Sequence, residues 1–318
     1  MSGLTESVPG FDAAVASRSS LVSYVPTYAA VGFVVILVAG GAPRDSLDLS
    51  LLRSRMDALD GVELAAALLV VVIVAVVLHP LQLPLVRLLE GYWPRGWRRV
   101  ISIAVARQRR KRDALASEAD PGRLVRAGGD TPESRRAVLQ ASLQLRRRFP
   151  PDDLLLPTAL GNVLRAMEND AGASYGADTV AWWPRLYPML GDQVRSIVDD
   201  RRNQLDAACR FAATGTVVAV LTAVLLARSG TWLALVLVPL ALAFVSYRAA
   251  VTAASAYGEA VRTAFDLHRF DLVAQLHLGL PRTPTDEVAA NRSLTRFWLQ
   301  DVPLAAVFVH PDGDHDDA

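Results

Sequence analysis

The stretch AACRFAATGTVVAVLTAVLLARSGTWLALVLVPLALAFVSY, residues 207–247, decides the fold. It holds two apolar segments, Ala207–Ala227 and Thr231–Tyr247, which are separated only by residues 228–230. A membrane-spanning helix needs about 20 mostly apolar residues, and lipid offers no partner for backbone N–H and C=O groups outside a helix. Both segments approach that length. The short connection between them therefore predicts an antiparallel transmembrane hairpin.

Two more apolar segments precede this hairpin, Val25–Ala42 and Val62–Leu78. The long apolar run of the second favours a transmembrane helix over the buried core helix of a soluble protein. The first has an alternative interpretation as a cleaved signal peptide, since small residues follow at 39–42. Only one basic residue, Arg18, precedes this segment, and Pro43 follows the best cleavage point, so we expect a retained span.

The composition agrees with a chain embedded in lipid. Of the 318 residues 52% are hydrophobic and 20% are charged, and the mean hydropathy is +0.27. Soluble domains usually carry more charge than this, so the apolar excess indicates a membrane environment. The single cysteine, Cys209, excludes an internal disulfide and cannot form a metal site alone. No cofactor or metal is predicted.

Basic residues near the span ends predict the orientation, because they stay on the cytoplasmic side. The long middle connection opens with Arg87, Arg95, Arg98 and Arg99 and ends with Arg201, Arg202 and Arg210. The opposite side has only Arg44, Arg53, Arg55 and Arg228. We therefore expect a multi-pass protein of the cell membrane with residues 92–206 and both termini in the cytoplasm. The expected fold is all-α, with four transmembrane helices in two hairpins.

The connection between the first two spans, DSLDLSLLRSRMDALDG, predicts a short external helix that lies on the outer leaflet or caps the bundle. Leu49, Leu52, Met56 and Leu59 would share one helical face. Gly61 is expected to end this helix, since glycine commonly follows a helix C-terminus.

After the second span, RRVISIAVARQRRKR (residues 98–112) predicts a basic amphipathic helix. One face would carry Trp97, Ile101, Ala104 and Val105, and the other Arg98, Arg99 and Arg109. Such a helix can lie on anionic lipids, where each basic residue adds about 1 kcal/mol. Ordinary positive-inside topology explains the same charges equally well. Trp93 and Trp97 fit an interfacial aromatic belt, and no nucleic-acid partner is expected.

The cytoplasmic segment is predicted to be helical. Residues 131–133, Thr-Pro-Glu, begin a helix that runs to about Arg148, because they supply a hydroxyl cap, a first-turn proline and an acid. A second helix is expected near Thr158, since residues 160, 163, 164 and 167 are apolar at helical spacing. Residues 172–176 break it. A short element with two tryptophans, residues 182–187, follows.

The helical pattern runs from Asp192 directly into the third span, and the fourth span continues beyond Arg248. We therefore expect a helical cytoplasmic domain that is continuous with the second hairpin. Ala250, Ala254 and Gly258 form a row of small residues that permits close helix approach. The predicted segments are an N-terminal segment (1–24), the first hairpin (25–91), the basic helix and cytoplasmic domain (92–206), the second hairpin with its extension (207–280), and a C-terminal helix with an acidic tail (281–318).

Few polar residues are candidates for chemistry. Asp199, Arg202 and Asp206 share one helix face, where carboxylates can act in acid–base catalysis if their neighbours tune them. Ion pairs on a helix surface are the simpler interpretation. We expect a structural role for His79, which lies at the inner end of the second span. The histidines of the polar tail, including His310, are expected to be exposed to solvent.

The most distinctive stretch is LLPTALGNVLRAMENDAGASYGADTVAWWPRLYPML, residues 155–190. With HPLQLPLVRLLEGYWP (79–94) and AYGEAVRTAFDLHRFDL (256–272), it resembles uncharacterised multi-pass membrane proteins of high-GC Gram-positive bacteria. The resemblance implies the architecture and supplies no activity. The candidate functional residues of this stretch are Thr158, Asn162, Arg165, Glu168, Tyr175, Asp178 and Arg185. Arg165 and Glu168 also suit an ordinary helical ion pair.

Three functions fit these observations. The first is a non-enzymatic membrane scaffold or interaction protein, whose cytoplasmic helices self-associate or bind a membrane or cytoplasmic partner. The second is an oligomeric pore or transporter, which needs a polar stripe, and only Thr214, Thr216 and Thr222 offer one. The third is an enzyme at the inner membrane surface that acts on lipid or envelope precursors through the pairs Arg165–Glu168 and Asp199–Arg202. The row of small residues favours the first.

Overall fold

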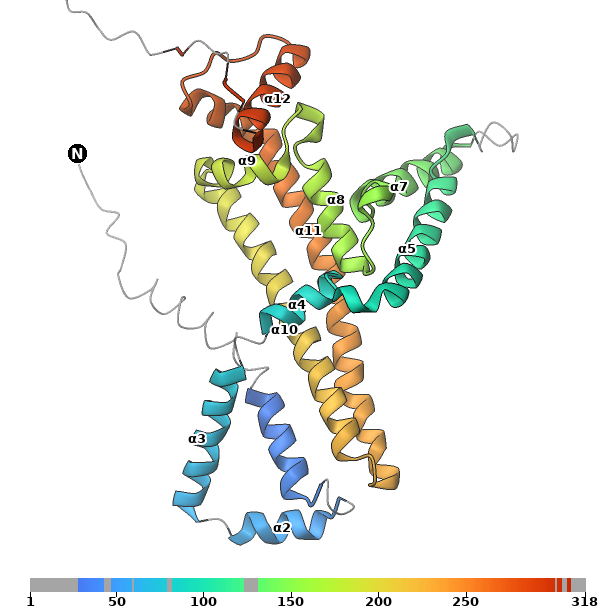
Figure 1. Cartoon of the computed structure of the whole chain (residues 1–318), viewed down its shortest axis with the longest axis vertical. Coiled ribbons are helices and arrows are strands. Elements are labelled where there is room, and N and C mark those ends of the chain that lie inside the picture. The colour runs from blue at the N-terminus through green and yellow to red at the C-terminus, as the bar shows by residue number, and fades with distance from the viewer. Residues whose placement is uncertain are drawn as a thin grey trace, which may run out of the picture. The chain divides into compact units, whose positions relative to one another are not determined.

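The computed structural model describes residues 28–42, 47–58, 60–78, 82–122, 131–300, 302–304 and 308–309 (Figure 1). Within these ranges the elements are helices, and the one extended pairing is an isolated antiparallel bridge between Leu278 and Phe308. The all-α prediction is thus confirmed. The N-terminal segment, the start of the first predicted span, His79, Leu59 and the histidines and acids of the tail lie outside the described residues.

The chain divides into two compact units. Unit 1 comprises Met1–Leu88 and Asp206–Ala250, and unit 2 comprises Leu89–Leu205 and Val251–Ala318. Two long helices belong to both units, α10 (Asp192–Leu225) and α11 (Leu237–Gln275). Each is a single uninterrupted helix, as the sequence predicts for the second hairpin. A 3₁₀ segment, Gly230–Val236, precedes α11.

Two helices are long and apolar enough to cross a membrane, Asp192–Leu225 and Gly230–Gln275. They correspond to the second predicted hairpin. At the first two predicted spans the apolar helices that can be described are shorter, Tyr28–Ala39 and Gly61–Ile73. The four-span arrangement therefore stays a prediction.

In unit 1, α10 and α11 pack closely because one of them has a glycine at the contact. A Cβ atom on Gly215 of α10 would lie only 3.0 Å from the backbone nitrogen of Ala243 of α11. Real Cβ contacts are rarely this short, so a larger residue would push the two helices apart. Unit 1 also contains a small cluster of buried apolar side chains: Leu37, Ala42, Leu47 and Leu226. Partly buried apolar residues pack against this cluster, namely Phe33, Leu225, Trp232 and Leu235.

The short helix predicted between the first two apolar segments is present as α2 (Leu49–Ala58) and is followed by α3 (Gly61–Leu78); its external location stays a prediction. The prediction that Gly61 ends the first of these helices is wrong, because Gly61 is the first residue of α3. The carboxylate of Asp60 accepts the backbone N–H groups of Val62 (3.0 Å) and Glu63 (2.8 Å). An acidic N-cap therefore starts a helix at the position where the glycine suggested a stop.

Besides its portions of α10 and α11, unit 2 contains several shorter helices. They are the end of α4 (Gln82–Glu90), α5 (Arg98–Glu118), α7 (Pro132–Arg148), α8 (Ala159–Asp170), α9 (Thr179–Leu186) and α12 (Pro284–Gln300). In Figure 1, α5 and α7 form an antiparallel pair, and α8 lies beside α7. The predicted starts and ends at Pro132, Arg148 and Thr158 are confirmed.

The core of unit 2 is built around aromatic side chains. Trp182 of α9 and Phe265 of α11 are completely buried, and the Trp182 ring meets Trp298 of α12 edge to face at 5.4 Å. Val198 of α10 and Val261 of α11 belong to the same cluster. The two helices that carry the apolar spans therefore also contribute to the core of the polar unit.

The row of small residues packs within the chain. Ala250 and Ala254 are fully buried, and a Cβ atom on Gly258 would lie 3.2 Å from the side chain of Met167 on α8. At Gly258 the close approach that this row permits is thus used by α11 and α8 of one chain. Self-association stays a prediction.

Candidate functional site

Three of the candidate residues from the distinctive stretch form hydrogen bonds with nearby backbone groups. Thr158 accepts the Gly161 N–H (3.1 Å) as the N-cap of α8, and Asp178 accepts the Ala181 N–H (2.9 Å) as the N-cap of α9. Asn162 is completely buried, and its side chain accepts the Leu156 N–H (2.7 Å) and donates to the Leu156 carbonyl (3.0 Å). Local geometry accounts for each of these side chains.

Two candidate arginines pair with close neighbours. Arg165 forms the expected ion pair with Glu168 at 3.3 Å and also donates to the Tyr92 hydroxyl at 3.3 Å. Arg185 donates to the Ala181 carbonyl (2.7 Å), and its guanidinium lies 4.4 Å from the centre of the Trp298 ring. These contacts join α8 to the residues after α4, and α9 to α12.

Tyr175 connects the turn after α8 to α11. Its hydroxyl donates to the Asp266 carboxylate at 2.6 Å, and the Arg269 guanidinium lies 4.0 Å from its ring centre. Burial raises the pKa of the Tyr175 phenol, and the bond to Asp266 raises it further, because the neutral hydroxyl is needed as donor. The tyrosine is thus held as a neutral donor.

The carboxylate of Asp199 is engaged by a tyrosine. The Tyr187 hydroxyl donates to Asp199 at 2.6 Å, and this bond is the main reason that the pKa of Tyr187 is raised. Arg202 and Asp206 are exposed. Among the described residues no ion pair joins Asp199 to Arg202, and no polar contact links them to Arg165 or Glu168. The structure does not bring the four proposed catalytic side chains together.

A polar cavity of about 320 Å³ lies within unit 2, between α7, the turn at 173–175 and α11. Two arginines that line it, Arg146 of α7 and Arg262 of α11, donate to the Asp170 carboxylate at 2.8 Å and 3.1 Å. Arg147 donates to Glu259 at 3.0 Å. Two guanidinium groups that share one carboxylate tie α7, α8 and α11 together. Sequence reasoning missed this network, because Asp170 and Arg262 are 92 residues apart and nothing local marks the pair.

The basic helix is present as α5, but its exposed apolar residues are largely different from the predicted ones. Trp97 and Arg98, Arg99 and Arg109 are exposed as predicted, and Arg109 pairs with Asp152 at 2.8 Å. The apolar residues predicted to meet lipid, Ile101, Ala104 and Val105, are partly buried instead. The exposed row at i, i+3, i+7 and i+10 consists of Val100, Ile103, Arg107 and Arg110. Trp93 meets Trp97 edge to face at 6.2 Å.

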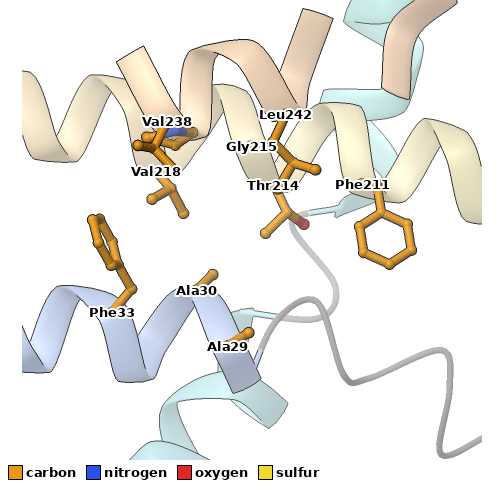
Figure 2. A pocket seen from close by; sticks show the side chains of 10 residues that line it. Ala29, Ala30, Phe33, Phe211, Thr214, Gly215, Val218, Val238 and Leu242 are labelled. Atoms are coloured by element: carbon orange, nitrogen blue, oxygen red, sulfur yellow. The ribbon is translucent and has the colours of Figure 1, made fainter. Parts of the chain in front are cut away.

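Unit 1 contains an apolar pocket of about 210 Å³ between the helix Tyr28–Ala39, α10 and the first turns of α11 (Figure 2). Figure 2 shows Ala30 and Phe33 of the first helix pointing toward Thr214 and Val218 of α10. The pocket is lined by Ala29, Ala30, Phe33, Phe211, Thr214, Gly215, Val218, Val238, Pro239 and Leu242. Apart from one threonine hydroxyl, these side chains offer no polar atom. No sequence motif marks such a pocket.

Two of the three threonines suggested as a polar stripe are satisfied by their own helix. Thr216 donates to the Ala212 carbonyl (2.8 Å), and the buried Thr222 donates to the Val218 carbonyl (2.7 Å). Their hydroxyls therefore do not offer the free polar lining that a pore needs. In the part of the chain that the structure describes, no group of three or more His, Cys, Asp or Glu side chains could hold a metal ion.

No protein-family model, curated protein or solved structure matches this chain. What the two cavities and the ion-pair network do is therefore inferred from their own residues. The resemblance to multi-pass membrane proteins of high-GC Gram-positive bacteria stays a prediction.

Proposed function

We propose that this protein is an integral membrane scaffold with four spans in two hairpins. Residues 92–206 and both termini would lie in the cytoplasm, where unit 2 binds a protein partner or a second copy of the chain. One observation carries the proposal. Helices α10 and α11 are each uninterrupted, and each contributes both an apolar span and core residues of unit 2. A partner bound to unit 2 would thus be held to the bilayer by continuous helices and not by a flexible linker.

The exposure of α3 supports the membrane location of the first hairpin as well. Val62, Leu68, Leu69, Val70, Val72 and Ile73 are exposed, with Val62 77% accessible and Leu69 59% accessible. At 100° per residue these positions cover about 200° of the helix circumference. A helix that is apolar all round is covered in a core or in lipid. The described residues of the chain leave these side chains of α3 uncovered, so lipid is the environment that fits them.

The outer face of α7 supports the binding role of unit 2. Leu139 and Leu143 lie one helical turn apart and are 60% and 42% exposed. Arg136, on the same helix, is exposed as well. Apolar side chains adjacent to basic ones are typical of surfaces that bind protein partners. We expect the partner to contact α7 here.

Anionic lipid is the second partner that we propose. The exposed row of α5 combines two apolar residues, Val100 and Ile103, with Arg107 and Arg110, and Arg99 is exposed nearby. Apolar side chains that insert beside basic groups favour the surface of an anionic bilayer. This proposal keeps the predicted lipid contact of the basic helix and moves it to the other face.

Photo-crosslinking in cells of the source organism tests the scaffold proposal. A photoreactive amino acid at Leu139 or Leu143 of the full chain is expected to trap a partner or a second copy, which is identified by mass spectrometry. The same group at Asp153, an exposed polar position of unit 2, serves as the control. A detergent-purified chain that is strictly monomeric, with no crosslink at either leucine, would show that the protein is not a scaffold.

A further inference from the structure

We infer that the apolar pocket of unit 1 holds one acyl chain of a membrane lipid. The inference rests on the membrane location proposed above and adds a ligand to it. The pocket is formed by three helices, and small side chains on two of them leave the space: Ala29 and Ala30 on the first helix, and Gly215 on α10. Phe33 and Phe211 supply aromatic walls, as Figure 2 shows.

The chemistry of the lining selects an apolar occupant. A buried water needs two to four polar partners, and the Thr214 hydroxyl is the one side-chain polar group that lines the pocket. An empty pocket would leave the lining atoms without dispersion contacts. A flexible hydrocarbon chain supplies these contacts without requiring a hydrogen bond.

The size of the pocket and the residues around it further restrict which molecule can occupy it. A helix with its side chains is about 10 Å across, so a space of about 210 Å³ is too small for α3 or for a helix of a second copy. The outer faces of the same helices carry exposed apolar side chains, including Val35, Val224 and Phe244. In the proposed location these faces meet lipid, so acyl chains surround the pocket at high concentration.

An acyl chain in this position would contact all three helices. It would stabilise the packing of Tyr28–Ala39, from the first predicted hairpin, against α10 and α11 of the second. The lipid would thus fill the contact between the two hairpins of unit 1.

Photolabelling of the full chain in nanodiscs tests this inference. The nanodiscs contain phosphatidylcholine with a diazirine in its acyl chain, and labelled residues are mapped by mass spectrometry. We expect label at pocket residues such as Phe33 and Val218 to exceed label at the exposed Val224 several-fold. Ala30→Phe, which fills the pocket, is expected to abolish this excess. Val35→Phe adds the same ring at an exposed position outside the pocket and is expected to leave it unchanged.

The outcomes separate the two proposals. Equal labelling of pocket and outer faces, or an excess that survives Ala30→Phe, would overturn the acyl-chain site and leave the membrane location intact. Absence of label from all the apolar helices would overturn the membrane location itself. If Ala30→Phe does not fold, Ala29→Leu narrows the same pocket and replaces it in the test. The distribution of label between the pocket and the outer faces of the unmodified chain also tests the acyl-chain site.

Discussion

Among the glycines that the structure describes, Gly161 would bring an added Cβ atom closest to a neighbouring atom. A Cβ atom there would lie 1.8 Å from the carbonyl oxygen of Glu90, because the first turn of α8 rests directly on the end of α4. Backbone cannot yield as a flexible side chain can, so Gly161→Ala is expected to destabilise unit 2 by about 1–3 kcal/mol or more. Gly96 has no atom within 4 Å of its added Cβ and provides the control. Thermal unfolding in detergent should show a lower midpoint for Gly161→Ala, and equal midpoints for both variants would contradict the close approach.

Tyr175 gives the fold a dependence on alkaline pH. Because its pKa is raised in the folded chain, the unfolded chain loses the phenolic proton first as pH rises past the ordinary value of 10.0. The contribution of the neutral phenol is complete below about pH 10 and decreases above it. Tyr175→Phe cannot donate to Asp266, so its deficit in unfolding free energy relative to the unmodified chain should be largest near neutral pH. A deficit that is the same at about pH 8 and about pH 11 would show that the phenol does not titrate differently in the fold.

Sequence reasoning succeeded at residues whose role is local. Thr131 and Thr158 were predictable as caps, because a helix start is encoded within four residues. Gly161 and Asp170 could not be predicted, since the atoms that constrain them come from distant parts of the chain. The seven functional candidates of the distinctive stretch act in the structure as helix caps, as a backbone hydrogen-bond partner or as contacts to neighbouring side chains. Ser, Thr, Asn and Asp side chains in such a segment commonly bond the nearby backbone at helix caps and turns.

At the scale of elements, the helices themselves were predictable and their buried faces were less so. The face of α5 is the instructive example. Hydrophobic periodicity placed Ile101 and Val105 together, and they do share a face, but that face is used inside unit 2. Periodicity reports which side chains lie together and not what covers them. The exposed row of α5 can therefore be identified only when the structure shows which of its apolar residues are partly buried.

The exposed row of α5 gives an element-scale prediction. In a Cys209→Ala background, a fluorescent label at Ile103→Cys should be better protected from a water-soluble quencher in nanodiscs rich in phosphatidylglycerol than in neutral ones. The row inserts where basic groups find anionic headgroups, at about 1 kcal/mol for each. Replacing Arg99, Arg107 and Arg110 by glutamine should remove the difference. Ser102→Cys is exposed on another face of α5, and equal protection at both positions would argue against an inserted row.

At the scale of the whole molecule, the topology depends on the first hairpin. Its described helices, Tyr28–Ala39 and α3, are apolar, and α2 connects their ends through residues 40–60. If both helices span the bilayer, α2 lies outside the cell together with the turn between α10 and α11. If only the second hairpin spans, the turn is outside and α2 is inside. The two topologies therefore differ in the side on which a single helix lies.

Cysteine labelling distinguishes these topologies in intact cells. The background is Cys209→Ala, since the native cysteine is buried and unique in the chain. Arg228→Cys, in the turn, should react with a membrane-impermeant maleimide from outside, whereas Ser117→Cys on α5 should react only after lysis. Ser54→Cys on α2 decides the first hairpin: external labelling requires four spans, and labelling only after lysis leaves two. The results expected at positions 228 and 117 follow from the charge distribution, because arginines near the ends of membrane spans stay on the cytoplasmic side. Labelling of Ser117→Cys from outside would reverse the orientation and place unit 2 where no cytoplasmic partner could reach it.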